Sequence, residues 1–85
     1  MSQLQAQVTA CPTDDGMALL DERTGRYWHL NTTGAAILTA LLNGATPEQV
    51  TNRLVTARPV SHQRATADVT ALLNHLTRAN LINAS

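Results

Sequence analysis

The sequence is poor in aromatic residues: it contains one Trp, one Tyr and no Phe among 85 residues. It also lacks lysine, so its positive charge comes from six arginines, which balance six acidic residues to a formal net charge of zero. A protein that binds nucleic acid through the phosphate backbone needs clustered positive charge. The charge balance therefore argues against a nucleic-acid partner.

Cysteines and long apolar segments are also scarce. Cys11 is the single cysteine, so no intrachain disulfide can form, which fits a reducing compartment. No uninterrupted apolar run approaches the roughly 20 residues that a bilayer-spanning helix needs. The first ten residues lack the charged and apolar regions of a signal peptide. We therefore expect a cytoplasmic protein with no membrane partner.

Apolar residues nevertheless make up 44% of the chain, which is enough for a folded core. Because many of them are alanines, the core depends on Leu, Ile, Val and the single Trp28. Apolar burial contributes about 25 cal/mol per Å². We therefore expect one domain over residues 1–85 with a modest core and marginal stability.

The first 30 residues show the alternation of apolar and polar side chains that is typical of strands. A turn made of two Asp and a Gly is predicted at residues 14–16, and a hairpin-like connection that ends in Gly25 is predicted at residues 22–25. Three strands follow from this pattern: an alternating segment that begins at Leu4 and ends near Pro12, residues 17–20, and residues 26–30.

From residue 31 onward the apolar residues recur at helical spacing. Asn31 is predicted to cap the first helix, and Gly44 to follow its C-terminus. Residues 46–49 read TPEQ, which predicts a capping box at the start of a second helix. Ser61 is predicted to cap the third helix, and Asn80 to follow it in a left-handed conformation.

The order of these elements predicts an α+β fold, and the short connections between the helices favour a compact tri-helical or winged helix-turn-helix-like arrangement. In this fold a three-stranded antiparallel sheet is followed by three helices. The terminal Leu81 and Ile82 could return to the body of the domain as an edge segment.

The sequence shows no pattern typical of catalysis. The three histidines, His29, His62 and His75, do not have the spacing of metal ligands and are interpreted as surface residues. The adjacent acids of residues 14–15 precede a glycine and are interpreted as a turn. There is no glycine-rich phosphate-binding loop. We therefore expect neither an enzyme nor a cofactor.

Both aromatic residues lie in the predicted third strand, within the segment RYWHLN. In a strand, Trp28 and Leu30 point to one face and Tyr27 and His29 to the other. We expect Trp28 and Leu30 to face the helices. No proline, lysine or bulge protects this edge. An unprotected edge with aromatic neighbours can accept a peptide as an additional strand.

Residues 15–82 resemble the PqqD-like family, the recognition elements of ribosomally synthesised and modified peptides (RiPPs). The resemblance rests on the ordered segments GMALLDERTGRYWHLNTTGAAIL, LLNGATPEQV and DVTALLNHLTRANLI. Within the family, the sequence is most similar to the stand-alone leader-peptide-binding proteins of lasso-peptide biosynthesis. Asn80 stands where the family often has glycine, and both residues tolerate a left-handed cap.

The resemblance implies a protein without catalytic activity or cofactor that binds the leader segment of a precursor peptide. It implies that the leader pairs antiparallel with the third strand, in a groove beside the third helix. The bound precursor would be presented to a leader peptidase and a macrocycle-forming cyclase. The candidate peptide-binding residues are Arg26, Tyr27, Trp28, His29, Leu30, Arg64, Asp68, Val69, Leu72, Leu73 and Leu76.

Two alternatives remain open at this stage. The second and third helices resemble a DNA-binding helix-turn-helix whose recognition helix would begin with His62, Gln63 and Arg64. The zero net charge and Asp68 on that helix argue against this function. The other alternative is an interaction module for a different partner, such as a radical-SAM maturase. We expect no nucleic-acid partner and a monomer or weak dimer.

Overall fold

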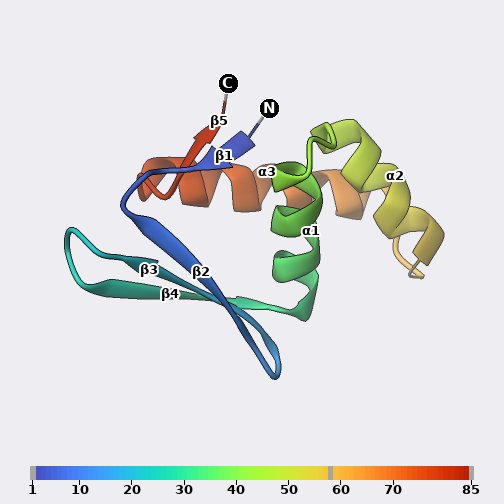
Figure 1. The fold of residues 1–85 in the computed structure, drawn as a ribbon. Coiled ribbons are helices and arrows are strands. Elements are labelled where there is room, and N and C mark those ends of the chain that lie inside the picture. The colour runs from blue at the N-terminus through green and yellow to red at the C-terminus, as the bar shows by residue number, and fades with distance from the viewer. Residues whose placement is uncertain (1, 58, 85) are drawn as a thin grey trace.

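The computed structural model describes residues 2–57 and 59–84. A three-stranded sheet precedes three helices, and a short two-stranded ribbon joins the two ends of the described chain (Figure 1). The elements are β1 (Ser2–Leu4), β2 (Val8–Thr13), β3 (Gly16–Asp21), β4 (Arg26–Asn31), α1 (Thr32–Leu42), α2 (Pro47–Ala57), α3 (His62–Arg78) and β5 (Ile82–Ala84).

The main sheet is an antiparallel meander in the order β2-β3-β4. Leu19 of β3 lies opposite Trp28, and Met17 lies opposite Leu30, so these four side chains share one face. Leu30 is buried on that face, whereas Tyr27 on the opposite face is 72% exposed. The predicted α+β fold and the predicted orientation of the third strand are both confirmed.

The first predicted strand is partly wrong, because its alternating segment is not one strand. The chain turns after Leu4, where the Val8 N–H donates to the Gln5 carbonyl at 3.0 Å. β1 pairs instead with β5, as the predicted return of the terminal segment allows. β2 continues through Pro12 and ends at Thr13. An edge strand tolerates a proline, because the position of the missing N–H can face away from the neighbouring strand.

The predicted helix caps are confirmed. The side chains of Asn31 and Ser61 each accept a hydrogen bond from the N–H three residues further on, at 2.8 and 3.1 Å. Thr46 and Gln49 form the reciprocal pair of a capping box, at 3.1 and 2.9 Å. Asn80 follows α3 with φ of 60°. None of the described helices combines the length and apolar character that a bilayer crossing requires.

Two clusters of buried side chains form the core. The first lies between the sheet, α1, α3 and the C-terminal segment, and comprises Val8, Leu19, Leu30, Leu38, Leu76, Leu81 and Ile82. The second joins the three helices and comprises Ile37, Leu41, Val50, Leu54, Ala65 and Val69. Leu72 and Leu73 pack against both clusters. Helix α3 thereby connects the helical half of the domain to the sheet (Figure 1).

Gly16 sets the approach of β3 to β4 at the start of the sheet. Its φ is +152°, and a Cβ at this position would meet the carbonyl oxygen of Leu30. Gly25, in the next turn, also has a positive φ of +75°, but a Cβ there would meet nothing. Substitution of Gly25 therefore tests the cost of a positive φ alone, and substitution of Gly16 tests that cost together with a steric clash.

We expect Gly16→Ala to lower the free energy of unfolding by about 2–4 kcal/mol, because a backbone clash adds to the strained φ. Gly25→Ala should cost only about 1 kcal/mol. Urea unfolding followed by circular dichroism measures both. Equal losses in the two variants would contradict the close approach at Gly16.

Candidate functional site

The two edges of the main sheet differ in what they offer a partner. The β2 edge carries Pro12, which cannot donate a backbone hydrogen bond. The β4 edge contains neither proline nor lysine, and no strand pairs with it in the described part of the chain. The Arg26 N–H is bonded to the Thr24 hydroxyl at 3.3 Å. Residues 27–30 therefore present the unprotected stretch of this edge.

Trp28 connects β4 to α3. Its ring makes an edge-to-face contact with His75 of α3, with 5.4 Å between the centroids and 74° between the planes. The Arg26 guanidinium carbon lies 5.3 Å from the centroid of the same ring, within the range of a cation–π contact. The half-buried indole is thus held from two sides at the boundary between the strand and the helix.

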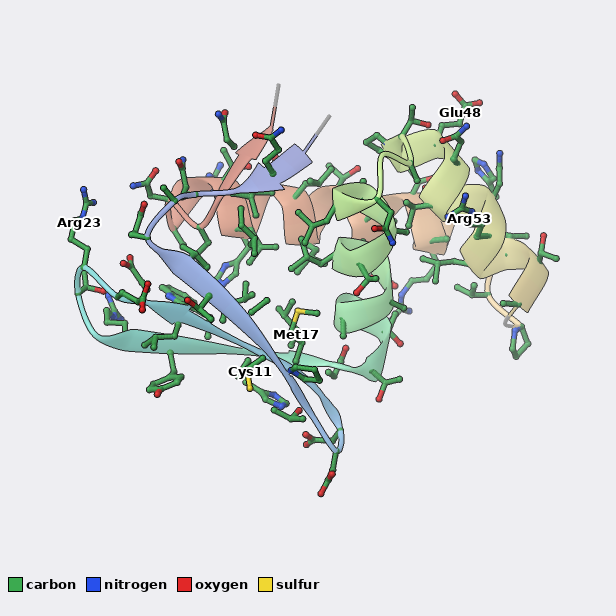
Figure 2. All side chains as sticks on the ribbon, viewed as in Figure 1. Cys11, Met17, Arg23, Glu48 and Arg53 are labelled. Carbon is green, nitrogen blue, oxygen red and sulfur yellow. The ribbon has the colours of Figure 1, made fainter. Side chains whose placement is uncertain are left out.

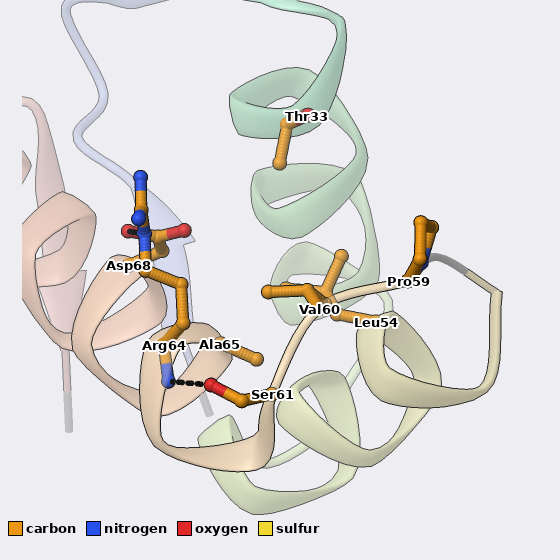
Figure 3. A pocket seen from close by; sticks show the side chains of 8 residues that line it. All are labelled: Thr33, Leu54, Pro59, Val60, Ser61, Arg64, Ala65 and Asp68. Carbon is orange, nitrogen blue, oxygen red and sulfur yellow. Dashed lines mark hydrogen bonds and ion pairs between the residues drawn. The ribbon is translucent and has the colours of Figure 1, made fainter.

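Two adjoining cavities lie along α3, on the side of the N-terminus of α1. The first has a volume of about 360 Å³ and is lined by Asn31, Thr33, Gly34, Ile37, Arg64, Asp68, Ala71 and Leu72. The second has a volume of about 420 Å³ and extends to the α2–α3 loop, with lining residues Thr33, Leu54, Pro59, Val60, Ser61, Arg64, Ala65 and Asp68 (Figure 3). Because they share Thr33, Arg64 and Asp68, we treat them as one α3 trough.

The α3 trough has an apolar floor and a polar rim. Leu54, Val60 and Ala65 point into the cavity, and the short Ala65 side chain leaves space open there (Figure 3). On the rim, the Arg64 Nε lies 3.6 Å from an Asp68 carboxylate oxygen, and these side chains are 74% and 47% exposed. Such exposed pairs contribute little to stability, so both groups are available to a ligand.

The outer face of the sheet carries a different polar group. His29 Nε2 lies 3.1 Å from an Asp15 carboxylate oxygen, which also accepts a hydrogen bond from the Thr13 hydroxyl at 3.1 Å. The hydrogen bond with His29 is the main cause that lowers the pKa of Asp15 below its usual range, followed by the bond from Thr13. This contact ties the β2–β3 turn to β4.

The structure brings together some of the candidate peptide-binding residues. Arg64, Asp68 and Leu72 line the α3 trough. Arg26 and Trp28 lie on the face of β4 that packs towards the helices, where Trp28 also contacts His75 of α3. The five residues therefore form two groups, one that lines the trough on α3 and one on β4.

The other candidates lie elsewhere. Leu30, Val69 and Leu76 are buried in the core, with exposures of 7%, 1% and 0%, so they support the site from beneath. Leu73 packs against the core clusters and lines neither cavity of the trough. Tyr27 and His29 are exposed on the outer face of the sheet, and both belong to β4, the strand with the free edge.

The sequence interpretation missed His75, which it treated as a surface residue. His75 is exposed, but its ring contacts Trp28. A helical pattern could have identified it, because Arg64, Asp68, Leu72 and His75 follow one another at intervals of four, four and three residues along one flank of α3. Within the described residues, no group of three or more His, Cys, Asp or Glu side chains is arranged to hold a metal ion.

An open strand edge beside a helix is the geometry that domains which bind peptides by strand addition use. The family described as coenzyme PQQ synthesis protein D (PqqD) matches residues 16–82. The chain belongs to this PqqD family, as the sequence resemblance predicted. A search of curated proteins gives no match.

Two solved structures share this fold. A lasso peptide synthetase B1, complexed with the leader peptide, is 35% identical and superimposes with a TM-score of 0.93 over 98% of each chain. TbiB1 in complex with the TbiA(beta) leader peptide is 24% identical, with a TM-score of 0.87 over 98% of this chain and 96% of that chain. The first of these similarities extends to sequence, and the second shows the fold.

The Asp15–His29 contact predicts a specific titration. Because the pKa of Asp15 is lowered in the folded state, its contribution to stability is present above the usual Asp pKa and is lost as the pH falls through the folded-state value. We expect His29→Ala to raise the pKa of Asp15 towards its usual range in a carbon-13 NMR titration of the carboxyl group. His62→Ala, on α3, serves as the control and should leave the Asp15 titration unchanged.

Proposed function

We propose that this protein binds the leader segment of a ribosomally synthesised lasso precursor peptide by strand addition to β4. The observation that carries the proposal is the unprotected stretch at residues 27–30 beside the α3 trough. Strand addition needs free backbone groups for affinity and adjacent pockets for side chains. The leader-bound state of the 35% identical relative supports the same class of ligand.

An antiparallel leader strand would meet both faces of the sheet. Side chains on its inner face would contact Trp28 and His75, and those on its outer face would contact Tyr27 and His29. The N-terminal end of such a strand lies at Asn31, where the α3 trough begins. The leader therefore enters from the trough and leaves towards the β3–β4 turn.

The proposed role is that of a non-catalytic adaptor. Holding the leader places the attached core peptide at a high effective concentration near a leader peptidase and a macrocycle-forming cyclase. Backbone bonds to β4 supply affinity that does not depend on sequence, and the trough selects side chains. The whole domain, residues 1–85, performs this role in the cytoplasm as a monomer or weak dimer.

Titration with the leader peptide of the cognate lasso precursor tests the proposal. We expect a dissociation constant in the micromolar range or below. The fluorescence emission should shift to shorter wavelength, because a leader strand would cover the half-buried indole of Trp28. Trp28 is the single Trp of the sequence, so the emission reports on this position alone. Leader peptides N-methylated at successive positions should lose affinity at alternate residues only, because half of the amides of a strand face its partner.

A pair of neighbouring variants on α3 makes the test specific. His75→Ala should weaken leader binding about 3- to 10-fold, because it removes a wall beside Trp28. Asn74→Ala, on an exposed flank of α3 that includes Ala67 and Thr70, should bind as the unmodified protein does, because Asn74 lines neither cavity of the trough. A flat titration, or equal effects of the two variants, would refute the proposed site.

A DNA duplex at low salt should not bind, because Asp68 partly neutralises Arg64 and the net charge is zero.

A further inference from the structure

The backbone groups of β4 point alternately to β3 and to the free edge. The Leu30 carbonyl oxygen points to β3, because it lies close to where a Cβ on Gly16 would stand. In an antiparallel ladder, successive residues direct their backbone groups to opposite sides. Trp28, two residues before Leu30, therefore also points to β3, whereas Tyr27 and His29 direct their N–H and C=O groups to the free edge.

This alternation decides how closely the side chains of a paired leader strand approach β4. Leader residues opposite Tyr27 and His29 exchange backbone hydrogen bonds with the strand. Leader residues opposite Arg26 and Trp28 form the non-hydrogen-bonded pairs, in which the side chains of the two strands lie closer together. Because Arg26 and Trp28 are on the inner face, the leader side chains opposite them also point to that face.

Arg26 is the charged residue that β4 carries on its inner face. Its side chain is exposed, and its guanidinium carbon lies 5.3 Å from the centroid of the Trp28 ring. The cation–π contact holds the guanidinium in place, so little conformational entropy is lost when a partner binds it.

No acidic side chain of the described residues forms an ion pair with Arg26. Its cross-strand neighbour Asp21 is buried, and the Asp21 carboxylate accepts a hydrogen bond from the Arg23 N–H at 3.0 Å. The guanidinium therefore remains available to a carboxylate of the ligand, at the end of β4 where the leader leaves the strand.

We propose that Arg26 selects for an acidic residue in the leader. The inference rests on the proposed function, in which the leader runs antiparallel to β4 and leaves towards the β3–β4 turn. The leader's Asp or Glu lies opposite Arg26, two residues after the leader residue that faces Trp28, and forms a cross-strand ion pair. This pair fixes the register of the leader, because a shift by one residue would move the carboxylate to the outer face.

Isothermal titration calorimetry with variants of the cognate leader peptide tests the pair. Each Asp of the leader is replaced by Asn and each Glu by Gln, one at a time, and each peptide is titrated into the unmodified protein and into Arg26→Gln. Arg26→Lys keeps the charge. The matched controls are Arg23→Gln, in the β3–β4 turn, and Arg53→Gln, on α2 at the other side of the molecule (Figure 2).

We expect Arg26→Gln to weaken binding of the unmodified leader about 3- to 5-fold at low ionic strength, as a cross-strand ion pair of this kind contributes. The loss should shrink at high salt, because salt screens an exposed pair. Arg26→Lys, Arg23→Gln and Arg53→Gln should each bind within about twofold of the unmodified protein, because other exposed charges contribute little.

One acidic leader residue should show the same loss when it is replaced by its amide. This residue directly follows the last leader position at which N-methylation weakens binding, which is the position opposite Tyr27. Its amide variant should bind Arg26→Gln no more weakly than the unmodified leader does, because either change alone already removes the pair.

The proposed pair is wrong if the leader has no acidic residue at that position, if the losses from Arg26→Gln and from every leader variant are additive, or if the coupling is to Arg23 instead. Replacement of the leader residue alone, in the unmodified protein, keeps the test decisive if circular dichroism shows that Arg26→Gln perturbs the fold. A flat titration of the unmodified protein with the unmodified leader is a separate result, which would contradict the proposed strand addition itself.

Discussion

β4 packs Trp28 and Leu30 against the core with one face, and its edge away from β3 carries backbone groups that pair with no strand in the described part of the chain. An open edge is normally a liability, because it can pair with any extended chain. Here the adjacent α3 restricts what can approach, through His75 at one end and the Arg64–Asp68 pair at the other. The proposed strand addition depends on this combination of an open edge on β4 and a polar wall on α3.

The small number of aromatic residues has a physical consequence for that edge. The single indole of Trp28 packs against the first core cluster and also forms the boundary of the candidate site. The core otherwise consists of aliphatic side chains and is small, so its stability is modest. A ligand that binds only the folded form adds to that stability by mass action. In the proposed function, leader binding and folding are therefore linked through Trp28.

Features encoded by local sequence could be predicted. The caps at Asn31, Thr46 and Ser61 are satisfied by residues within three positions, so the sequence contains both partners. Strand alternation likewise predicted which faces Trp28 and Leu30 occupy. The pairing of β1 with β5 depends on residues about 80 positions apart in the chain, which periodicity near Leu4 does not reveal.

The candidate site was predicted only in part for a similar reason. The free edge follows from the order of strands, and Arg64, Asp68 and Leu72 follow from the family resemblance. Whether a helical leucine faces the trough or the core depends on how α3 rotates against two clusters. Leu76 belongs to the core as a result. His75 was missed because its partner is on a strand 47 residues earlier, at position 28.

Amide hydrogen exchange along β4, measured by NMR with and without the leader peptide, tests strand addition most directly. Binding should slow exchange at alternate amides within residues 27–30 by at least tenfold and leave the β2 edge unchanged. Exchange that stays fast throughout β4 in the bound state, or protection that falls on β2 instead, would contradict the account.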